Sequence, residues 1–158
     1  MILLTIGTQL PFDRLVKAMD ELAPTLSEEI FGQIGEASYQ PQNFEWAATL
    51  KPHEFEARFR SASVVVSHAG IGTILTAQKL QKPLIIVPRQ AKYGEHRNDH
   101  QLATAYQVRD KPGVHVAAEV SELAGLLQHG SLEAARDDLD VDGRLLFVSN
   151  LRTYLASG

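Results

Sequence analysis

The chain has 158 residues, 44% of them hydrophobic, which suits one globular domain with its own core. Its formal net charge is −4, so we expect no general attraction to nucleic acid or anionic lipid, because both need clustered Lys and Arg. The absence of cysteine excludes disulfide frameworks, thiolate metal sites and cysteine nucleophiles, and it favours a cytoplasmic location. No apolar run approaches the roughly 18 residues of a membrane span, and the first residues lack a basic leader.

The first third of the chain predicts strands and helices in alternation. Residues 2–6 form an apolar run typical of a buried strand. Residues 11–22 then carry apolar side chains at helical spacing, namely Phe12, Leu15, Val16, Met19 and Leu22. Two weaker strands at 29–34 and 44–50 and a short helix at 52–60 follow.

The middle of the chain gives the clearest pattern. Residues 63–67 and 83–88 are β-branched runs that flank a helix at about 72–80, which is a βαβ unit with parallel strands. The alternation continues with a helix at about 98–108, a strand at 114–117 and a helix at 119–127. The predicted fold class is α/β, a Rossmann-like parallel sheet with helices on both faces.

We predict one Rossmann-like, nucleotide-binding domain over residues 1–143 and a C-terminal helix within 144–158. The apolar residues of 145–155 share one helical face, and they are Phe147, Val148, Leu151, Tyr154 and Leu155. This stripe suits docking on a partner protein or packing on the domain's own sheet, and both alternatives stay open.

A glycine-rich turn between a predicted strand and a predicted helix is the densest chemical signal. It has the sequence Ser67-His68-Ala69-Gly70-Ile71-Gly72-Thr73. Glycines let a ligand approach the backbone closely, and the free N–H groups and dipole of a helix N-terminus favour a diphosphate there. Thr73 adds a hydroxyl donor. A tight turn that binds nothing is the alternative.

Polar residues also follow the next predicted strand. Arg89 comes directly after it, and residues 94–101 lead into a helix. Because loops at the carboxyl ends of parallel strands share one edge, we expect both segments to face one crevice, together with Gly7 and Thr8. The candidate ligand contacts in the second segment are His96, Arg97, Asn98, His100 and Gln101. Caps and ordinary loop contacts are the alternative, since Asn98 or Asp99 is a natural helix N-cap.

Several other chemistries are disfavoured. Ser67 and His68 are adjacent on a strand end and point to opposite faces, so they do not form a nucleophile and base pair. His96 and His100 lack the His-Glu-x-x-His pattern, and we expect no metal. A nicotinamide fingerprint is incomplete, but Arg89 suits a 2′-phosphate, so NADP binding stays open.

An ordered set of motifs resembles the C-terminal domain of glycosyltransferase family 28. They are Ile6-Gly7-Thr8, Phe12-Asp13, Ser67-His68-Ala69-Gly70-x-Gly72-Thr73, Lys82-Pro83-Leu84-Ile85-Ile86-Val87-Pro88 and His100-Gln101-Leu102-Ala103. The resemblance spans about residues 1–127. It is strongest to stand-alone donor-binding subunits of split GT-B glycosyltransferases, including the catalytic subunit of the dolichol-linked N-acetylglucosaminyltransferase. Residues 94–101 resemble the bacterial exopolysaccharide branch.

The resemblance implies a hexosyltransferase subunit that binds a UDP-sugar, needs no other cofactor and is recruited to the inner membrane face by a membrane-associated acceptor-binding subunit. Relatives of this kind add glucuronic acid or another hexose to a polyprenyl-diphosphate-linked saccharide in exopolysaccharide biosynthesis. By motif position, Gly70, Gly72 and Thr73 lie at the diphosphate, and His100 and Gln101 lie at the donor sugar. Relatives often have a ribose-binding glutamate at the position of Thr76, so ribose binding here is weaker or made by another group.

The expected reaction has no covalent intermediate. Backbone N–H groups, the helix dipole, and Arg89 or Arg97 would stabilise the departing UDP, and we expect the general base on the partner. We also expect Arg89 to pair with a carboxylate of the donor, as glucuronic acid presents. The alternative is an NADP- or nucleotide-binding regulatory module without transferase activity.

Overall fold

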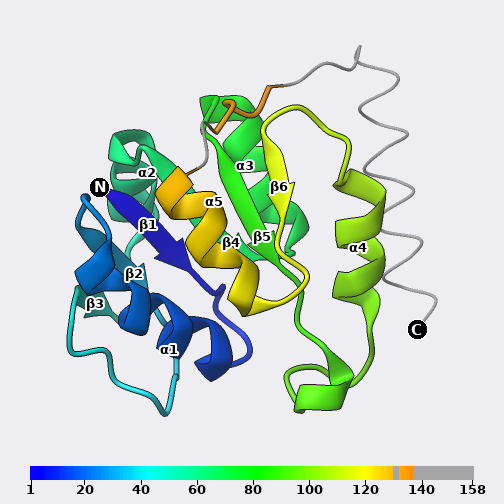
Figure 1. Ribbon diagram of the computed structural model, residues 1–158, viewed down its shortest axis with the longest axis horizontal. Coiled ribbons are helices and arrows are strands. Elements are labelled where there is room, and N and C mark those ends of the chain that lie inside the picture. Colours follow the sequence, from blue (N-terminus) through cyan, green and yellow to red (C-terminus); the bar gives the residue numbers. More distant parts are fainter. Residues whose placement is uncertain (130–131, 137–158) are drawn as a thin grey trace.

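The chain folds around a six-stranded parallel sheet (Figure 1), in a computed structural model that describes residues 1–129 and 132–136. The strand order is β3-β2-β1-β4-β5-β6. The strands are β1 (Ile2–Thr5), β2 (Ile30–Gln33), β3 (Glu45–Ala47), β4 (Val64–His68), β5 (Leu84–Val87) and β6 (Val114–Val116). This order is that of a doubly wound, Rossmann-like sheet, so the predicted α/β fold class is confirmed.

Helices cover both faces of the sheet (Figure 1). On one face lie α1 (Asp13–Leu22) and α5 (Leu123–His129), and on the other lie α2 (Pro52–Ser61), α3 (Ile71–Leu80) and α4 (His100–Val108). Short 3-10 turns are η1 (Ala23–Thr25), η2 (Ala91–Tyr93) and η3 (Val120–Glu122). The result is three layers with the sheet in the middle.

The two faces of the sheet form two apolar cores. Successive side chains of a strand point to opposite faces, so Leu3 packs with α2, α3 and α4 whereas Leu4 packs with α1 and α5. β1 and β5 are buried along their whole length. Because both faces are covered, these strands read as continuous apolar runs without polar alternation.

The predicted elements in the described residues are present, with shifted ends. The first helix begins at Asp13 and not at 11, because Phe12 is its N-cap residue and accepts the first backbone bonds through its carbonyl. The strand expected at 44–50 pairs with β2 only over Glu45–Ala47. The helix expected from 119 starts as the turn η3 and becomes α-helical at Leu123.

The predicted helix at 145–155 and the boundary at 143 lie outside the described residues. Within residues 1–129 and 132–136, no helix is both long enough and apolar enough to cross a bilayer.

Two carboxylates of α1, Asp13 and Asp20, hold the loop between β2 and β3, and Asp13 accepts from the Ser38 N–H at 3.0 Å. Asp20, which is buried, accepts hydrogen bonds from the Tyr39 hydroxyl at 2.6 Å and from the backbone N–H groups of Gln42 and Asn43. Burial raises the pKa of Asp20, but these hydrogen bonds outweigh it and hold the pKa below its usual value. The loop is therefore tied to α1 by charge-assisted hydrogen bonds.

Candidate functional site

Three loops meet at the carboxyl edge of the sheet. They follow β1, β4 and β5, which are neighbours in the sheet, and each leaves its strand on the same side (Figure 1). This is the edge at which open α/β sheets bind ligands. Side chains from the three loops contact one another, and these contacts fix how the loops lie around the crevice that the sequence predicted.

The N-terminus of α3 opens onto this edge. Gly70 is the N-cap residue, and the first i to i−4 bond within the helix is donated by Ile74 to the carbonyl of Gly70 at 3.2 Å. In the described residues, the N–H groups of Ile71, Gly72 and Thr73 precede that bond and have no protein acceptor. A Cβ placed on Gly72 would meet no atom within 4 Å, so this turn is open to a ligand.

Thr73 is half-buried in that first turn. The Thr76 hydroxyl is used within the helix, where it donates to the Gly72 carbonyl at 2.8 Å. Its oxygen retains acceptor capacity. A ribose contact by Thr76 stays a prediction.

The imidazole of His68 lies between two glycines. A Cβ on Gly7 would come within 2.9 Å of its Nε2, and a Cβ on Gly70 within 2.5 Å of its Cε1. Gly7 also has a φ of +79°, which favours glycine. These two glycines make room for the histidine, whereas Gly72 is the glycine that leaves room for a ligand. Ser67 is fully buried and donates to the His68 carbonyl, so it supports the turn from beneath.

Gln101 and Arg89 join the loops from below. The Gln101 side-chain oxygen accepts from the backbone N–H groups of Ala69 at 3.3 Å and of Arg89 at 3.0 Å. The Arg89 guanidinium donates to the carbonyls of Ile6 at 2.7 Å and Leu10 at 2.6 Å. Both side chains are less than a tenth exposed.

These contacts change two expectations from the sequence. A direct contact between Arg89 and a donor carboxylate does not fit this geometry, because the guanidinium is buried and already bonded to two backbone carbonyls. Burial lowers the pKa of Arg89 to about 10, partly offset by the charge of Glu95, so the group still carries its proton at neutral pH. The side-chain amide of Gln101 likewise forms its hydrogen bonds with protein atoms, so a direct contact with the donor sugar does not fit this geometry either.

The segment after β5 is fixed by polar bonds within itself. The Asp99 carboxylate accepts from the Ala91 N–H at 2.8 Å, and the Asn98 side chain accepts from the His100 N–H at 3.1 Å. His96 accepts weakly from the Asn98 N–H at 3.4 Å. α4 consequently begins at His100, and Asn98 has the structural role that the sequence left open.

An ion pair missed by the sequence analysis clamps this segment to α1. Arg14 donates to both carboxylate oxygens of Glu95, at 2.7 and 2.9 Å, and also reaches the Pro88 carbonyl at 3.3 Å. Its guanidinium lies 4.3 Å from the centre of the Tyr93 ring. The Glu95 carboxylate also accepts from the Gln90 N–H at 3.1 Å. The pair holds the loop on which His96 and Arg97 stand.

A hollow of about 380 Å³ adjoins the crevice. It lies between the loop after β1 and the segment after β5, and it is lined by Gln9, Leu10, Gly94, Glu95, His96 and Arg97. Burial, and then the charge of Arg89, lower the pKa of His96. Thr8 is exposed on the neighbouring loop. In the described part of the chain, no three His, Asp or Glu side chains gather as metal ligands.

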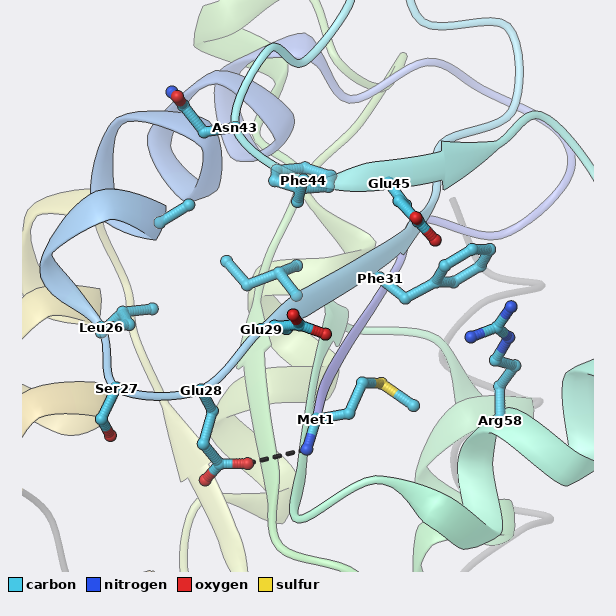
Figure 2. Close-up of a pocket in the computed structure, with 12 residues that line it drawn as sticks. Met1, Leu26, Ser27, Glu28, Glu29, Phe31, Asn43, Phe44, Glu45 and Arg58 are labelled. Carbon is cyan, nitrogen blue, oxygen red and sulfur yellow. Dashed lines mark hydrogen bonds and ion pairs between the residues drawn. The ribbon is translucent and has the colours of Figure 1, made fainter.

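A second hollow, also of about 380 Å³, lies at the amino edge of the sheet (Figure 2). Glu28, Glu29 and Glu45 line it, and Glu28 binds the N-terminal amine of Met1 at 2.8 Å. Arg58 stacks on the Phe31 ring beside it. The excess of carboxylates disfavours a diphosphate, so the carboxyl edge is the better anion site.

A doubly wound sheet with an open helix N-terminus at its carboxyl edge defines a Rossmann-like domain of the kind found in GT-B glycosyltransferases. The chain belongs to glycosyltransferase family 28, as its C-terminal domain, because the family model matches residues 1–129. The resemblance drawn from the motifs is therefore confirmed.

The chain is similar to the UDP-N-acetylglucosamine transferase subunit ALG13 of Eremothecium gossypii, with 40% identity over 73 residues. The match covers 46% of this chain and 34% of the relative, so it spans about a third of the relative's length.

Solved structures share the fold. The solution structure of ALG13 has a TM-score of 0.64 at 16% identity and covers 96% of each chain. The kitacinnamycin glycosyltransferase has a TM-score of 0.58 at 17% identity, with 99% of this chain and 40% of that one covered. SsfS6 of Streptomyces sp. SF2575, complexed with thymidine diphosphate, has a TM-score of 0.54 at 23% identity, with 98% and 36% covered.

Proposed function

We propose that this chain is the donor-binding subunit of a UDP-sugar-dependent glycosyltransferase. The observation that carries the proposal is the open first turn of α3, where three N–H groups point away from the helix at the carboxyl edge and no atom crowds Gly72. Membership of the glycosyltransferase family supports it. So do the name of the ALG13 relative, a UDP-N-acetylglucosamine transferase subunit, and the thymidine diphosphate bound by SsfS6.

In this proposal the diphosphate binds at Gly72 and Thr73, where free N–H groups and the helix dipole stabilise negative charge. The donor sugar lies toward His96 and Arg97, in the hollow beside the crevice, and His100 stands at the start of α4. Departing UDP gains charge in the transition state, and fixed N–H donors stabilise that charge without reorganising. No metal and no further cofactor take part.

The acceptor side belongs to a second protein. We propose a membrane-associated subunit that binds a polyprenyl-diphosphate-linked saccharide and supplies the general base. The chain acts at the inner face of the membrane in exopolysaccharide biosynthesis, and residues 94–101 favour that branch of the family. The transferred hexose, with glucuronic acid the first candidate, leaves UDP directly and without a covalent intermediate.

NADP binding is no longer supported by a specific observation. The sequence kept it open because Arg89 suits a 2′-phosphate, but the guanidinium is buried under the loop after β1. Titration calorimetry of the full chain with UDP, UDP-sugars and NADPH tests the proposal. We expect UDP and at least one UDP-sugar to bind, and preference for NADPH would overturn the proposal. Sugar transfer only after addition of the acceptor-binding subunit would support the split arrangement.

A further inference from the structure

The hydrogen bonds of Gln101 fix the orientation of its amide. Two backbone N–H groups, those of Ala69 and Arg89, point at one side-chain atom, and both can only donate. That atom must be the amide oxygen, because the amide nitrogen is also a donor. The other terminal atom is therefore the NH₂ group, and it lies 3.1 Å from Nδ1 of His68.

A second donor reaches the same ring atom. Arg89 places a guanidinium N–H 3.1 Å from Nδ1 of His68, and a guanidinium cannot accept. With two donors directed at it, Nδ1 must be the unprotonated nitrogen. The ring is then neutral only as the tautomer that carries its proton on Nε2.

Burial and charge support this protonation state. Burial, and then the positive charge of Arg89, lower the pKa of His68 to about 3. Arg89 is the charged group that faces the ring, and Glu95 faces the guanidinium in turn.

The Nε2 atom of His68 keeps some exposure to solvent. In the described residues, the side-chain atoms that are fully buried without a partner are Arg89 Nε and His115 Nε2. His68 Nε2 also has no protein partner, so it is not fully buried. It lies beside the positions of Gly7 and Gly70, at the carboxyl edge of the sheet.

We propose that Gln101 and Arg89 are positioning residues that hold His68 as the neutral Nε2–H tautomer and turn this N–H toward anionic oxygens of a bound nucleoside diphosphate. The ligand in this proposal rests on the proposed function, whereas the tautomer does not. Gln101 then acts through His68, and not as the direct sugar contact that the family resemblance implies.

Long-range ¹H–¹⁵N correlation spectra of the ¹⁵N-labelled full chain show which ring nitrogen of His68 carries the proton, and they need no bound ligand. We expect a pyridine-type signal for Nδ1 and a pyrrole-type signal for Nε2, assigned by their loss in His68→Gln. Neither nitrogen should titrate down to about pH 5, well above the lowered pKa. A proton on Nδ1 in the wild-type chain would overturn the proposal.

The Gln101→Glu variant tests whether Gln101 holds His68 in this tautomer. One carboxylate oxygen can still accept the two backbone N–H groups, but the other now faces Nδ1 as an acceptor. We expect the proton to move to Nδ1, which leaves Nε2 without a hydrogen to donate, so the Kd for UDP should rise about tenfold, as for the loss of one charge-assisted hydrogen bond. Gln128→Glu, exposed on α5, is the matched control. An unchanged tautomer and unchanged UDP affinity in Gln101→Glu would refute the positioning role.

His68 variants test the donor itself. His68→Gln keeps an N–H near the Nε2 position, whereas His68→Leu has none. We expect His68→Gln to retain UDP affinity within a few fold and His68→Leu to lose about tenfold. Equal losses would refute the donor role. If the wild-type chain binds no UDP, the proposed function fails, and the tautomer spectra still decide the positioning separately.

Discussion

Replacing Gly72 with valine puts a branched side chain on the open first turn of α3. The protein itself should tolerate it, because a Cβ there meets no atom within 4 Å and Gly72 is exposed. Valine is also a slightly better helix residue than glycine, by a few tenths of a kcal/mol. The variant should therefore fold with an unfolding midpoint close to that of the wild type.

UDP binding should respond differently. A diphosphate that uses two N–H groups of this turn gains about 1.5 kcal/mol or more from each charge-assisted hydrogen bond. Losing both costs about 3 kcal/mol, which is roughly a hundredfold in Kd. Titration calorimetry with UDP measures this loss, and thermal unfolding checks the fold.

Gly125→Val is the matched control. Gly125 lies in α5, on a different element from the crevice, and a Cβ there also meets no atom within 4 Å. It should bind UDP like the wild type. Normal UDP binding by Gly72→Val would show that the turn is a structural one and would refute the diphosphate site.

Three further substitutions test other contacts. Arg14→Met leaves the Glu95 carboxylate without its cation, so the free energy of unfolding in urea should fall by about 2–3 kcal/mol. An unchanged free energy of unfolding would show that the ion pair does not stabilise the fold. Asp20 has a lowered pKa, so its contribution is full above about pH 4, the usual carboxylate pKa, and is lost as pH falls through the lowered value. Asp20→Asn should therefore lower stability at neutral pH and flatten this acid dependence in unfolding curves, and an unaltered pH profile would contradict the assignment. Arg89→Lys should weaken UDP-glucuronate and UDP-glucose binding equally, because Arg89 supports the loops, and a selective loss of UDP-glucuronate would restore a direct carboxylate contact.

The sheet was predictable because buried parallel strands leave a local signal. β4 and β5 are β-branched runs, and both end at polar or glycine-containing loops. The parallel arrangement and the shared carboxyl edge then follow from the alternation of strands and helices. The shortened strand β3 was less predictable, because pairing at an edge depends on its neighbour and not on its own residues.

The contacts beneath the crevice were not predictable in the same way. Arg14 and Glu95 are 81 positions apart, and no periodicity links them. Arg89 and Gln101 were correctly placed near the crevice, but their polarity suggested ligand contacts whereas their side chains bond to the protein.

Gly70 has an ordinary extended backbone, with a φ of −97°, which any residue can adopt. Glycine is favoured at this position because the ring of His68 occupies the space of a side chain. Substitutions at these two positions should therefore be epistatic. Gly70→Ser, a favourable N-cap change on its own, would force the His68 ring to shift, whereas beside a small residue at position 68 no such shift is needed. In related chains, replacement of the histidine would remove the steric constraint on the glycine position, so we expect the two positions to change together.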